Sequence, residues 1–342
     1  MSSNLPSPSP PHPIPLIDLS HFASPATRLA ISRSLVHACH STGFVYITGH
    51  GIPSAQIAEA FAWSRRFFAL SEEEKGRAGR GEGSKVFRGW SCVGGEQVPE
   101  VVGEKGKNVV DWTVRRRYQE AYGLGTDDNP AQPNVWIPSS LLPGFRTFML
   151  SFQSSCWGVA QDILRALALG LGLPDEDCLL KFHAQGENEL SLRHYPAVDE
   201  DAVRSGQLDR LGAHTDFDSF TLLWQDGLGG LEVKDMEGGW VDVRPVEGAL
   251  VMNIGDVLPR WSNNFLISTL HRVHLPPLDD SYESQDGKRK TIPRFSIPYF
   301  VIPKSDTVME PLEGDFGKEL EKKYEPVLWG EYQAKKIDGI FR

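Results

Sequence analysis

The first half of the chain carries hydrophobic patterns typical of helices. Over residues 145–170 the apolar residues recur at steps of three and four, which predicts one long amphipathic helix. Two shorter helical patterns precede it, at residues 29–36 and 57–70. The apolar run at residues 43–47 lies between them and predicts a short strand. We therefore expect several helices around at least one strand in this half.

After Pro174 the pattern changes to short apolar runs separated by Gly, Asp and Asn, and it continues to about Ile302. This pattern predicts an antiparallel barrel or sandwich. The predicted strands are Ser191–His194, Phe220–Trp224, Leu231–Val233, Trp240–Val243, Leu250–Ile254, Leu266–Leu275 and Arg294–Val301. No internal repeat is present, and no Gly-x-Gly-x-x-Gly motif follows a strand, which argues against a dinucleotide-binding fold.

The remaining segments have compositions typical of tails and loops. Residues 1–13 are rich in Pro and Ser and are expected to form a disordered tail. Residues 76–140 are dense in Gly, Pro and charge, which predicts loops with short strands and a candidate lid. We predict a mainly β protein with accessory helices, in which residues 14–342 form a single catalytic unit. Its predicted parts are a helix-rich region 14–180, a β core 181–310 and a C-terminal helical segment 311–342.

Composition narrows the class of protein. The 342 residues are 40% hydrophobic and 23% charged, as in an ordinary soluble globular protein. The formal net charge of −10 argues against a nucleic-acid partner, and no apolar stretch approaches the roughly 20 residues that cross a membrane. The four cysteines lie far apart without a CxxC pair, which favours a reducing compartment. We expect a cytoplasmic protein with a small-molecule substrate; the pattern does not indicate an oligomeric state.

A possible metal site begins with His214 and Asp216. On a strand, side chains two residues apart point to the same face, so these two could share one ion. His271 follows about four short strands later and could return to that face, whereas His274 would point the other way. Asp218 competes with Asp216 but lies one step further along. Two imidazoles and one carboxylate suit Fe(II) and dioxygen chemistry, although zinc accepts the same ligands.

Further short motifs occur in a fixed order along the chain. They are Ile14–Leu19, Gly43–Ile47, His50–Ile52, Phe67–Leu70, Arg88–Trp90, Pro133–Trp136, Pro143–Arg146, His194–Pro196, His214–Asp216, Gly229–Val233, Asn253–Asp256, His271–Val273 and Arg294–Ser296. In this order they resemble the isopenicillin-N-synthase-like family of Fe(II)/2-oxoglutarate dioxygenases over nearly the whole chain. The resemblance implies a double-stranded β-helix, or jelly-roll, core and the use of Fe(II), 2-oxoglutarate and dioxygen.

The resemblance also implies a site for 2-oxoglutarate. In the family an Arg-x-Ser element binds the distal carboxylate of the co-substrate, a role that falls to Arg294 and Ser296 here. A guanidinium offers two parallel donors to a carboxylate, and a serine two residues further along a strand faces the same side. Tyr195, in the His-Tyr-Pro motif, would supply a further hydroxyl.

The substrate pocket is less well defined by the sequence. Its candidate residues are Ser191, Arg193, Phe217, Phe300, Phe87 and Arg88. Ser191 and Phe217 depart from the arginine and tyrosine expected in the family's thymine hydroxylases, which argues against a nucleobase substrate. The resemblance implies oxidation of a small organic molecule in specialised metabolism, by hydroxylation, desaturation or ring rearrangement.

Three other classes of protein remain open. An iron oxidase of the same fold would keep the three metal ligands without using 2-oxoglutarate. A zinc hydrolase could use the same ligands but needs a general base, and none is identifiable from spacing. A non-enzymatic scaffold on this fold would be expected to have lost a ligand, whereas His214, Asp216 and His271 are all present.

Overall fold

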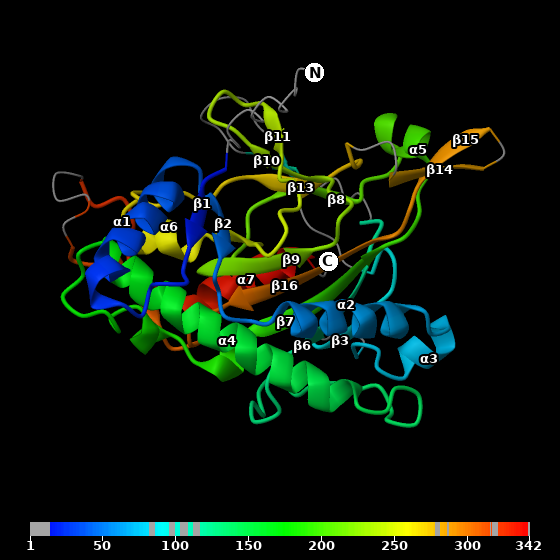
Figure 1. Ribbon diagram of the computed structural model, residues 1–342, viewed down its shortest axis with the longest axis horizontal. Helices are drawn as coiled ribbons and strands as arrows, with labels where there is room; N and C mark the ends of the chain where they lie inside the picture. Colours follow the sequence, from blue (N-terminus) through cyan, green and yellow to red (C-terminus); the bar gives the residue numbers. More distant parts are fainter. Residues whose placement is uncertain are drawn as a thin grey trace, which may run out of the picture.

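Two β-sheets face each other, and helices cover the outer face of the larger sheet (Figure 1). The structure is a computed structural model that describes residues 14–81, 86–95, 100–102, 109–111, 117–277, 281–285, 287–314, 316 and 321–340. The predicted disordered tail, residues 1–13, lies outside this range. The two facing sheets confirm the predicted jelly-roll core.

The larger sheet has eight strands in the order β1-β2-β12-β9-β16-β7-β6-β3. Its strands are β1 Leu16–Asp18, β2 Phe44–Thr48, β3 Gly89–Ser91, β6 Glu120–Leu124, β7 Glu189–Tyr195, β9 Phe220–Gln225, β12 Leu250–Ile254 and β16 Arg294–Val301. Four of these come from the helix-rich first half of the chain. The region expected to be mainly helical therefore extends the sheet at both of its edges.

The smaller sheet has four strands in the order β11-β10-β13-β8. They are β8 Leu211–His214, β10 Leu231–Lys234, β11 Trp240–Asp242 and β13 His271–Val273. Within the described residues, three two-stranded ribbons accompany these sheets: β4 Glu100–Val102 with β5 Val109–Asp111, β14 Tyr282–Gln285 with β15 Lys288–Thr291, and β17 Val308–Met309 with β18 Val327–Leu328. The second ribbon, which is rich in polar and charged residues, directly precedes β16.

The long helix α4, Phe145–Gly170, contacts α1, Pro25–Ser41, α2, Ser54–Phe68, and strand β16. Its apolar face is fully buried at residues such as Phe152 and Ile163, as the steps of three and four predict. Gly170 lets α1 cross closely, since a Cβ there would collide with the Ser32 carbonyl. The short helices are α3 Glu72–Gly76, α5 Glu200–Arg204, α6 Val257–Trp261, η1 Leu180–Phe182 and η2 Gln185–Glu187.

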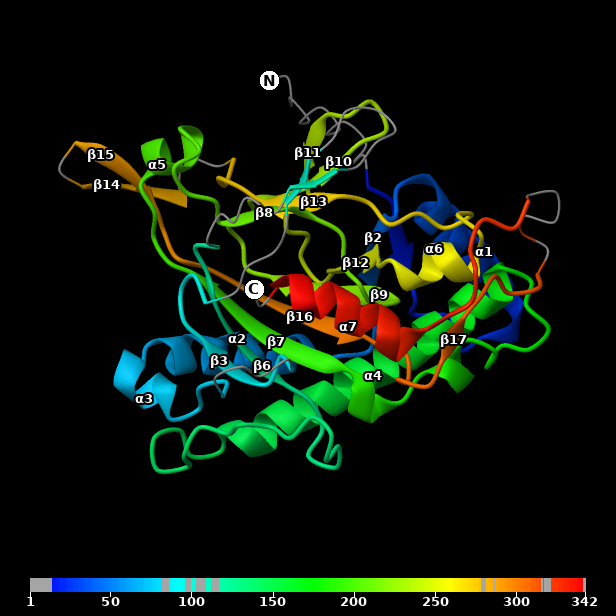
Figure 2. The same cartoon turned by 180° about the vertical axis from the view of Figure 1, so that it is seen from behind.

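The predicted strand Leu266–Leu275 was too long, because only His271–Val273 pairs with neighbouring strands. Strand β8 was not among the predicted strands, since Leu211–His214 carries only a short apolar signal. Within the described residues, no helix is both long and apolar enough to cross a membrane. The C-terminal helix α7, Trp329–Ile340, lies alongside β16 and β9 (Figure 2).

A buried ionic cluster links strands β6 and β7 to helix α3 and to the neighbouring strand β3. The Glu120 carboxylate accepts hydrogen bonds from Lys75 Nζ at 2.7 Å, Trp90 Nε1 at 2.8 Å and His194 Nδ1 at 2.7 Å. Burial by itself raises the pKa of Glu120, but these three donors outweigh burial and bring the pKa below its usual value. The cluster therefore stabilises the folded state with an ionised Glu120.

Removal of this carboxylate should destabilise the protein. We expect Glu120→Ala to lower the free energy of unfolding by about 3–5 kcal/mol, because it strands a buried ammonium group without its partner. Urea denaturation at neutral pH measures the change. Glu237→Ala, at an exposed turn, serves as the control and should stay within about 0.5 kcal/mol of wild type. A loss in Glu120→Ala no larger than in this control would contradict the prediction.

Candidate metal centre

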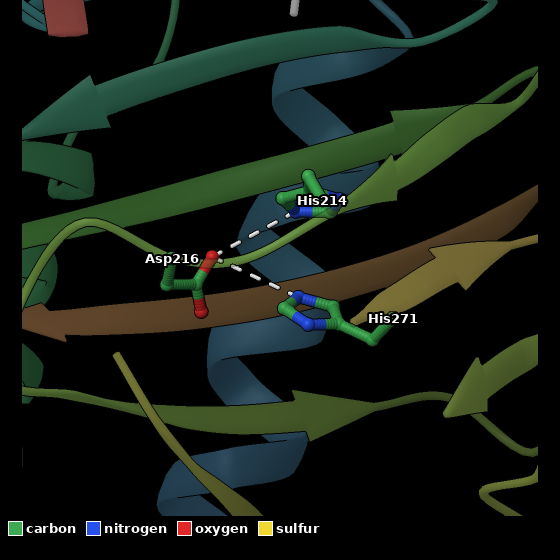
Figure 3. A group of neighbouring side chains, drawn as sticks. All are labelled: His214, Asp216 and His271. Carbon is green, nitrogen blue, oxygen red and sulfur yellow. Dashed lines mark ion pairs between the residues drawn. The ribbon is translucent and has the colours of Figure 1, made fainter. Parts of the chain in front are cut away.

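Two histidines face each other across neighbouring strands of the smaller sheet. β13 pairs antiparallel with β8, and His271 stands directly opposite His214 in the register. The two imidazole rings lie 4.3 Å apart between centroids, and both point toward Asp216 (Figure 3). One nitrogen from each histidine and one oxygen of Asp216 all lie within 4.8 Å of one another, so they could share one metal ion.

Backbone carbonyls orient both imidazoles. His214 Nδ1 lies 2.9 Å from the Gly212 carbonyl oxygen, and His271 Nδ1 lies 3.2 Å from that of Thr269. Since a carbonyl can only accept a hydrogen bond, each Nδ1 carries the proton and each Nε2 keeps its lone pair. Both Nε2 atoms lie 3.7 Å from Asp216 Oδ1. Three donor atoms therefore converge on one point.

Asp216 reaches this point by a route that the sequence pattern did not predict. β8 ends at His214, and Asp216 lies in the connection that follows, so the expected alternation along one strand is wrong here. The connection is held by the Asp256 N–H, which donates to the Asp216 carbonyl at 2.9 Å. The side chains of His214 and Asp216 meet because the backbone after β8 turns from the smaller sheet toward the larger one.

Two residues of the larger sheet hold the other oxygen of Asp216. Thr221 Oγ1 donates to Asp216 Oδ2 at 2.5 Å, and Asn253 Nδ2 donates to the same atom at 2.7 Å. Thr221 on β9 and Asn253 on β12 are direct cross-strand partners. Oδ1 is thereby left to face the two imidazoles. Sequence reasoning noted Asn253 only as part of a motif and missed Thr221.

Charge distinguishes Asp216 from its competitor Asp218. Burial raises the pKa of Asp216, but the hydrogen bonds that it accepts from Thr221 and Asn253 contribute to a net pKa below the usual range. Burial and then the charge of Asp216 raise the pKa of Asp218 well above its ordinary value. Asp216 is therefore the ionised carboxylate, the form that binds a metal.

The three metal-directed residues line a cavity between the two sheets, and the predicted 2-oxoglutarate residues line the same cavity. Tyr195 and Arg294 are cross-strand partners on β7 and β16, and Ser296 follows two residues later on the same face. Arg294 is fixed by bonds from Nε to the Gly229 carbonyl at 2.9 Å and from Nη1 to Ser296 Oγ at 3.2 Å. The guanidinium is thus oriented before any ligand binds.

Four of the six predicted pocket residues line this cavity: Arg193, Phe217, Phe300 and Phe87. Ser191 and Arg88 are not among the described residues that line it, which corrects their predicted place in the pocket. Arg88 is 2% exposed, and its Nη1 lies 3.5 Å from a carboxylate oxygen of Glu189. Ser191 is 1% exposed and is paired with Gly123 of the neighbouring strand β6.

The C-terminal helix adds a wall that sequence reasoning missed. Trp329, Gln333 and Ile337 recur every four residues on one face of α7, and all three line the cavity. The helix is anchored by Asp256, which accepts hydrogen bonds from Lys336 Nζ and Tyr332 Oη, each at 3.1 Å. From the predicted lid segment 76–140, the described residues Val86, Phe87, Arg117 and Gln132 also line the cavity.

A jelly-roll core with two imidazoles and one carboxylate at a cavity is the arrangement of mononuclear non-haem iron oxygenases. Residues 14–139 match the family model for the N-terminal region of a non-haem dioxygenase in morphine synthesis. Residues 186–303 match the model of the 2OG-Fe(II) oxygenase superfamily.

Individual proteins are similar over most of the chain. The 2-oxoglutarate-dependent dioxygenase gloF of Glarea lozoyensis is 36% identical over 85% of this chain and 87% of its own length. The proline hydroxylase buaE of Petromyces alliaceus is 34% identical over 93% and 97%. The crystal structure of a full-length Neurospora crassa protein in complex with alpha-KG superposes with a TM-score of 0.82 at 33% identity, over 95% of this chain and 96% of that one.

The chain therefore belongs to the 2OG-Fe(II) oxygenase superfamily. It is an oxidoreductase that carries out oxidation dependent on Fe(II), 2-oxoglutarate and dioxygen. The resemblance inferred from the ordered motifs is confirmed. The donor set fits Fe(II), because two imidazole nitrogens and one carboxylate oxygen within 4.8 Å of one another could hold the ion.

The hydrogen bond from Thr221 to Asp216 should control metal affinity. We expect Thr221→Val to weaken metal binding by about 10–100-fold, because the carboxylate loses a donor that orients it. Thr221→Ser keeps the hydroxyl and should bind metal within about threefold of wild type. Calorimetric titration of the metal-free protein with Mn(II) measures both. Equal affinities for the two variants would contradict the assigned role.

Proposed function

We propose that His214, Asp216 and His271 hold Fe(II). The observation that carries this proposal is the convergence of both Nε2 atoms and one carboxylate oxygen at a single point in the cavity wall. The Nδ1 atoms and the second carboxylate oxygen are already engaged by the protein, as is usual for metal ligands. The cavity that these residues line would give the co-substrate and dioxygen access to the bound ion.

Arg294, Ser296 and Tyr195 bind the distal carboxylate of 2-oxoglutarate in this proposal; we call these three residues the clamp. Arg294 is 1% exposed, and within the described residues its Nη1 and Nη2 bond to neutral groups, Ser296 and Gln225. A guanidinium in such a position can pair strongly with a carboxylate. Support comes from the fact that the clamp and the metal ligands line one cavity.

Fe(II) held by these residues would supply the redox chemistry with dioxygen: one oxygen atom converts 2-oxoglutarate into succinate and carbon dioxide, and the other oxidises a C–H bond of the substrate and ends in the product or in water. The protein's own contribution is to hold the substrate beside the metal and to keep water away. Phe217, Phe300 and the face of α7 with Trp329 and Ile337 are suited to that task, because they present apolar surface to the cavity. Hydroxylation, desaturation and ring rearrangement all start from the same arrangement.

We propose a small organic molecule of specialised metabolism as the substrate. The cavity combines aromatic walls with the polar side chains of Glu189, Arg193 and Gln333, so it suits an apolar body with polar substituents. The Neurospora crassa protein has been solved with thymine. A nucleobase is disfavoured here because Phe217 stands in the cavity wall in place of the expected tyrosine, and the buried Ser191, which does not line the cavity, stands in place of the expected arginine. The alternative of an iron oxidase without 2-oxoglutarate is disfavoured because the clamp is complete.

Two substitutions should separate the metal site from the clamp. We expect Asp216→Ala to lose Fe(II) binding, since it removes the one charged ligand of the three. Arg294→Met should keep Fe(II) but weaken 2-oxoglutarate binding by at least about 30-fold, because the buried carboxylate loses its partner. Anaerobic titrations followed by iron content and by the visible absorption of the iron–2-oxoglutarate complex measure the two losses. Arg204→Met, on exposed α5, is the control.

Either of two outcomes would contradict the proposal. Retention of stoichiometric Fe(II) by Asp216→Ala would rule out the metal assignment. Unchanged 2-oxoglutarate affinity in Arg294→Met would rule out the clamp. Succinate formation with candidate substrates then identifies the molecule that is oxidised.

A further inference from the structure

A second buried arginine lies beside the clamp. Arg210 directly precedes β8, and its guanidinium carbon lies 5.4 Å from the centre of the Tyr195 ring. The guanidinium carbon of Arg294 lies 5.0 Å from the same ring. Both arginines are 1% exposed. Two positive charges, one from each sheet, are therefore brought to one tyrosine of the proposed 2-oxoglutarate site.

The charge of these two groups is only partly compensated within the protein. Arg210 Nε and Nη2 are buried and find no hydrogen-bond partner in the part of the chain that the structure describes. The carboxylate that acts on Arg210 is Asp226, whose oxygens already accept backbone N–H groups of Leu228 and Phe295. A buried cation without a partner is costly. Such a site is stabilised when an anion binds.

Arg210 stays charged in this setting. Burial and then repulsion from Arg294 lower the pKa of Arg210 to about 10, which still leaves it protonated at neutral pH. An approaching carboxylate would relieve the repulsion between the two guanidinium groups. Tyr195 lies near both guanidinium groups, so its ring position, and that of its hydroxyl, depends on both.

We infer that Arg210 is a positioning residue that supplies a second positive charge for the distal carboxylate of 2-oxoglutarate. It orients Tyr195 by packing on its ring and adds to the positive potential that Arg294 provides. This role rests on the proposed clamp. Arg210 would then contribute to the choice of co-substrate, because only a 2-oxo acid with a second carboxylate benefits from its charge.

The test compares two ligands that differ only at the distal end. 2-Oxoglutarate carries a carboxylate there, and 2-oxopentanoate carries a methyl group on a chain of equal length. Binding of each to the Mn(II)-loaded protein is measured by calorimetry, which avoids turnover. We expect Arg210→Met to raise the Kd for 2-oxoglutarate by about tenfold or more and to change that for 2-oxopentanoate by less than about threefold.

Matched variants separate charge from packing. Arg210→Lys keeps the charge and should recover most of the affinity for 2-oxoglutarate, whereas Arg210→Gln should behave like Arg210→Met. Arg204→Met removes a nearby exposed charge and should match wild type. Arg210→Gln also provides a second neutral variant if Arg210→Met does not fold.

The possible failures are distinguishable. Equal weakening of both ligands in the neutral variants, or no weakening of either, overturns the inference for Arg210. The same holds if Arg210→Lys binds no better than Arg210→Gln. If the wild-type protein itself fails to prefer 2-oxoglutarate over 2-oxopentanoate, the proposed clamp fails first, and the role of Arg210 falls with it.

Discussion

The site depends on how the two oxygens of Asp216 are divided between the two sheets. Oδ2 is held by Thr221 and Asn253 of the larger sheet, at 2.5 and 2.7 Å. Oδ1 faces the histidine pair of the smaller sheet, 3.7 Å from each Nε2. A carboxylate buried with a single partner would be poorly compensated, whereas one shared in this way is both charged and oriented. The proposed metal site therefore forms only when both sheets are in place.

The same junction between the sheets defines the cavity. Strands β7 and β16 contribute Tyr195, Arg294 and Ser296 from one side, and β8 and β13 contribute the histidines from the other. Helix α7 covers this space and is tied to Asp256, whose own N–H holds the backbone at Asp216. Asp256 therefore anchors both the helix that lines the cavity and the turn that presents Asp216, the proposed metal ligand.

Charge is arranged along this cavity in a definite order. An ionised carboxylate and two imidazoles stand at the proposed metal site, and two buried guanidinium groups stand around Tyr195. 2-Oxoglutarate carries two negative groups that match the metal and the guanidinium groups respectively. Because the protein has already excluded water from these groups, their attraction for the co-substrate is stronger than at a solvated surface.

The local pattern of apolar residues and short motifs by itself determined much of the secondary structure and the family of this protein. The apolar steps of α4 and the runs of β7, β9, β12 and β16 follow from side-chain period, and the ordered motifs identified the family. Only the tertiary structure decided the contacts that the periodicity of side chains along one element cannot encode. Asp216 reaches the histidines through a turn, Thr221 and Asn253 meet it across a sheet, and Arg210 comes to lie beside Tyr195. These contacts join residues far apart in sequence or outside regular elements, where only the packing of two sheets fixes direction and distance.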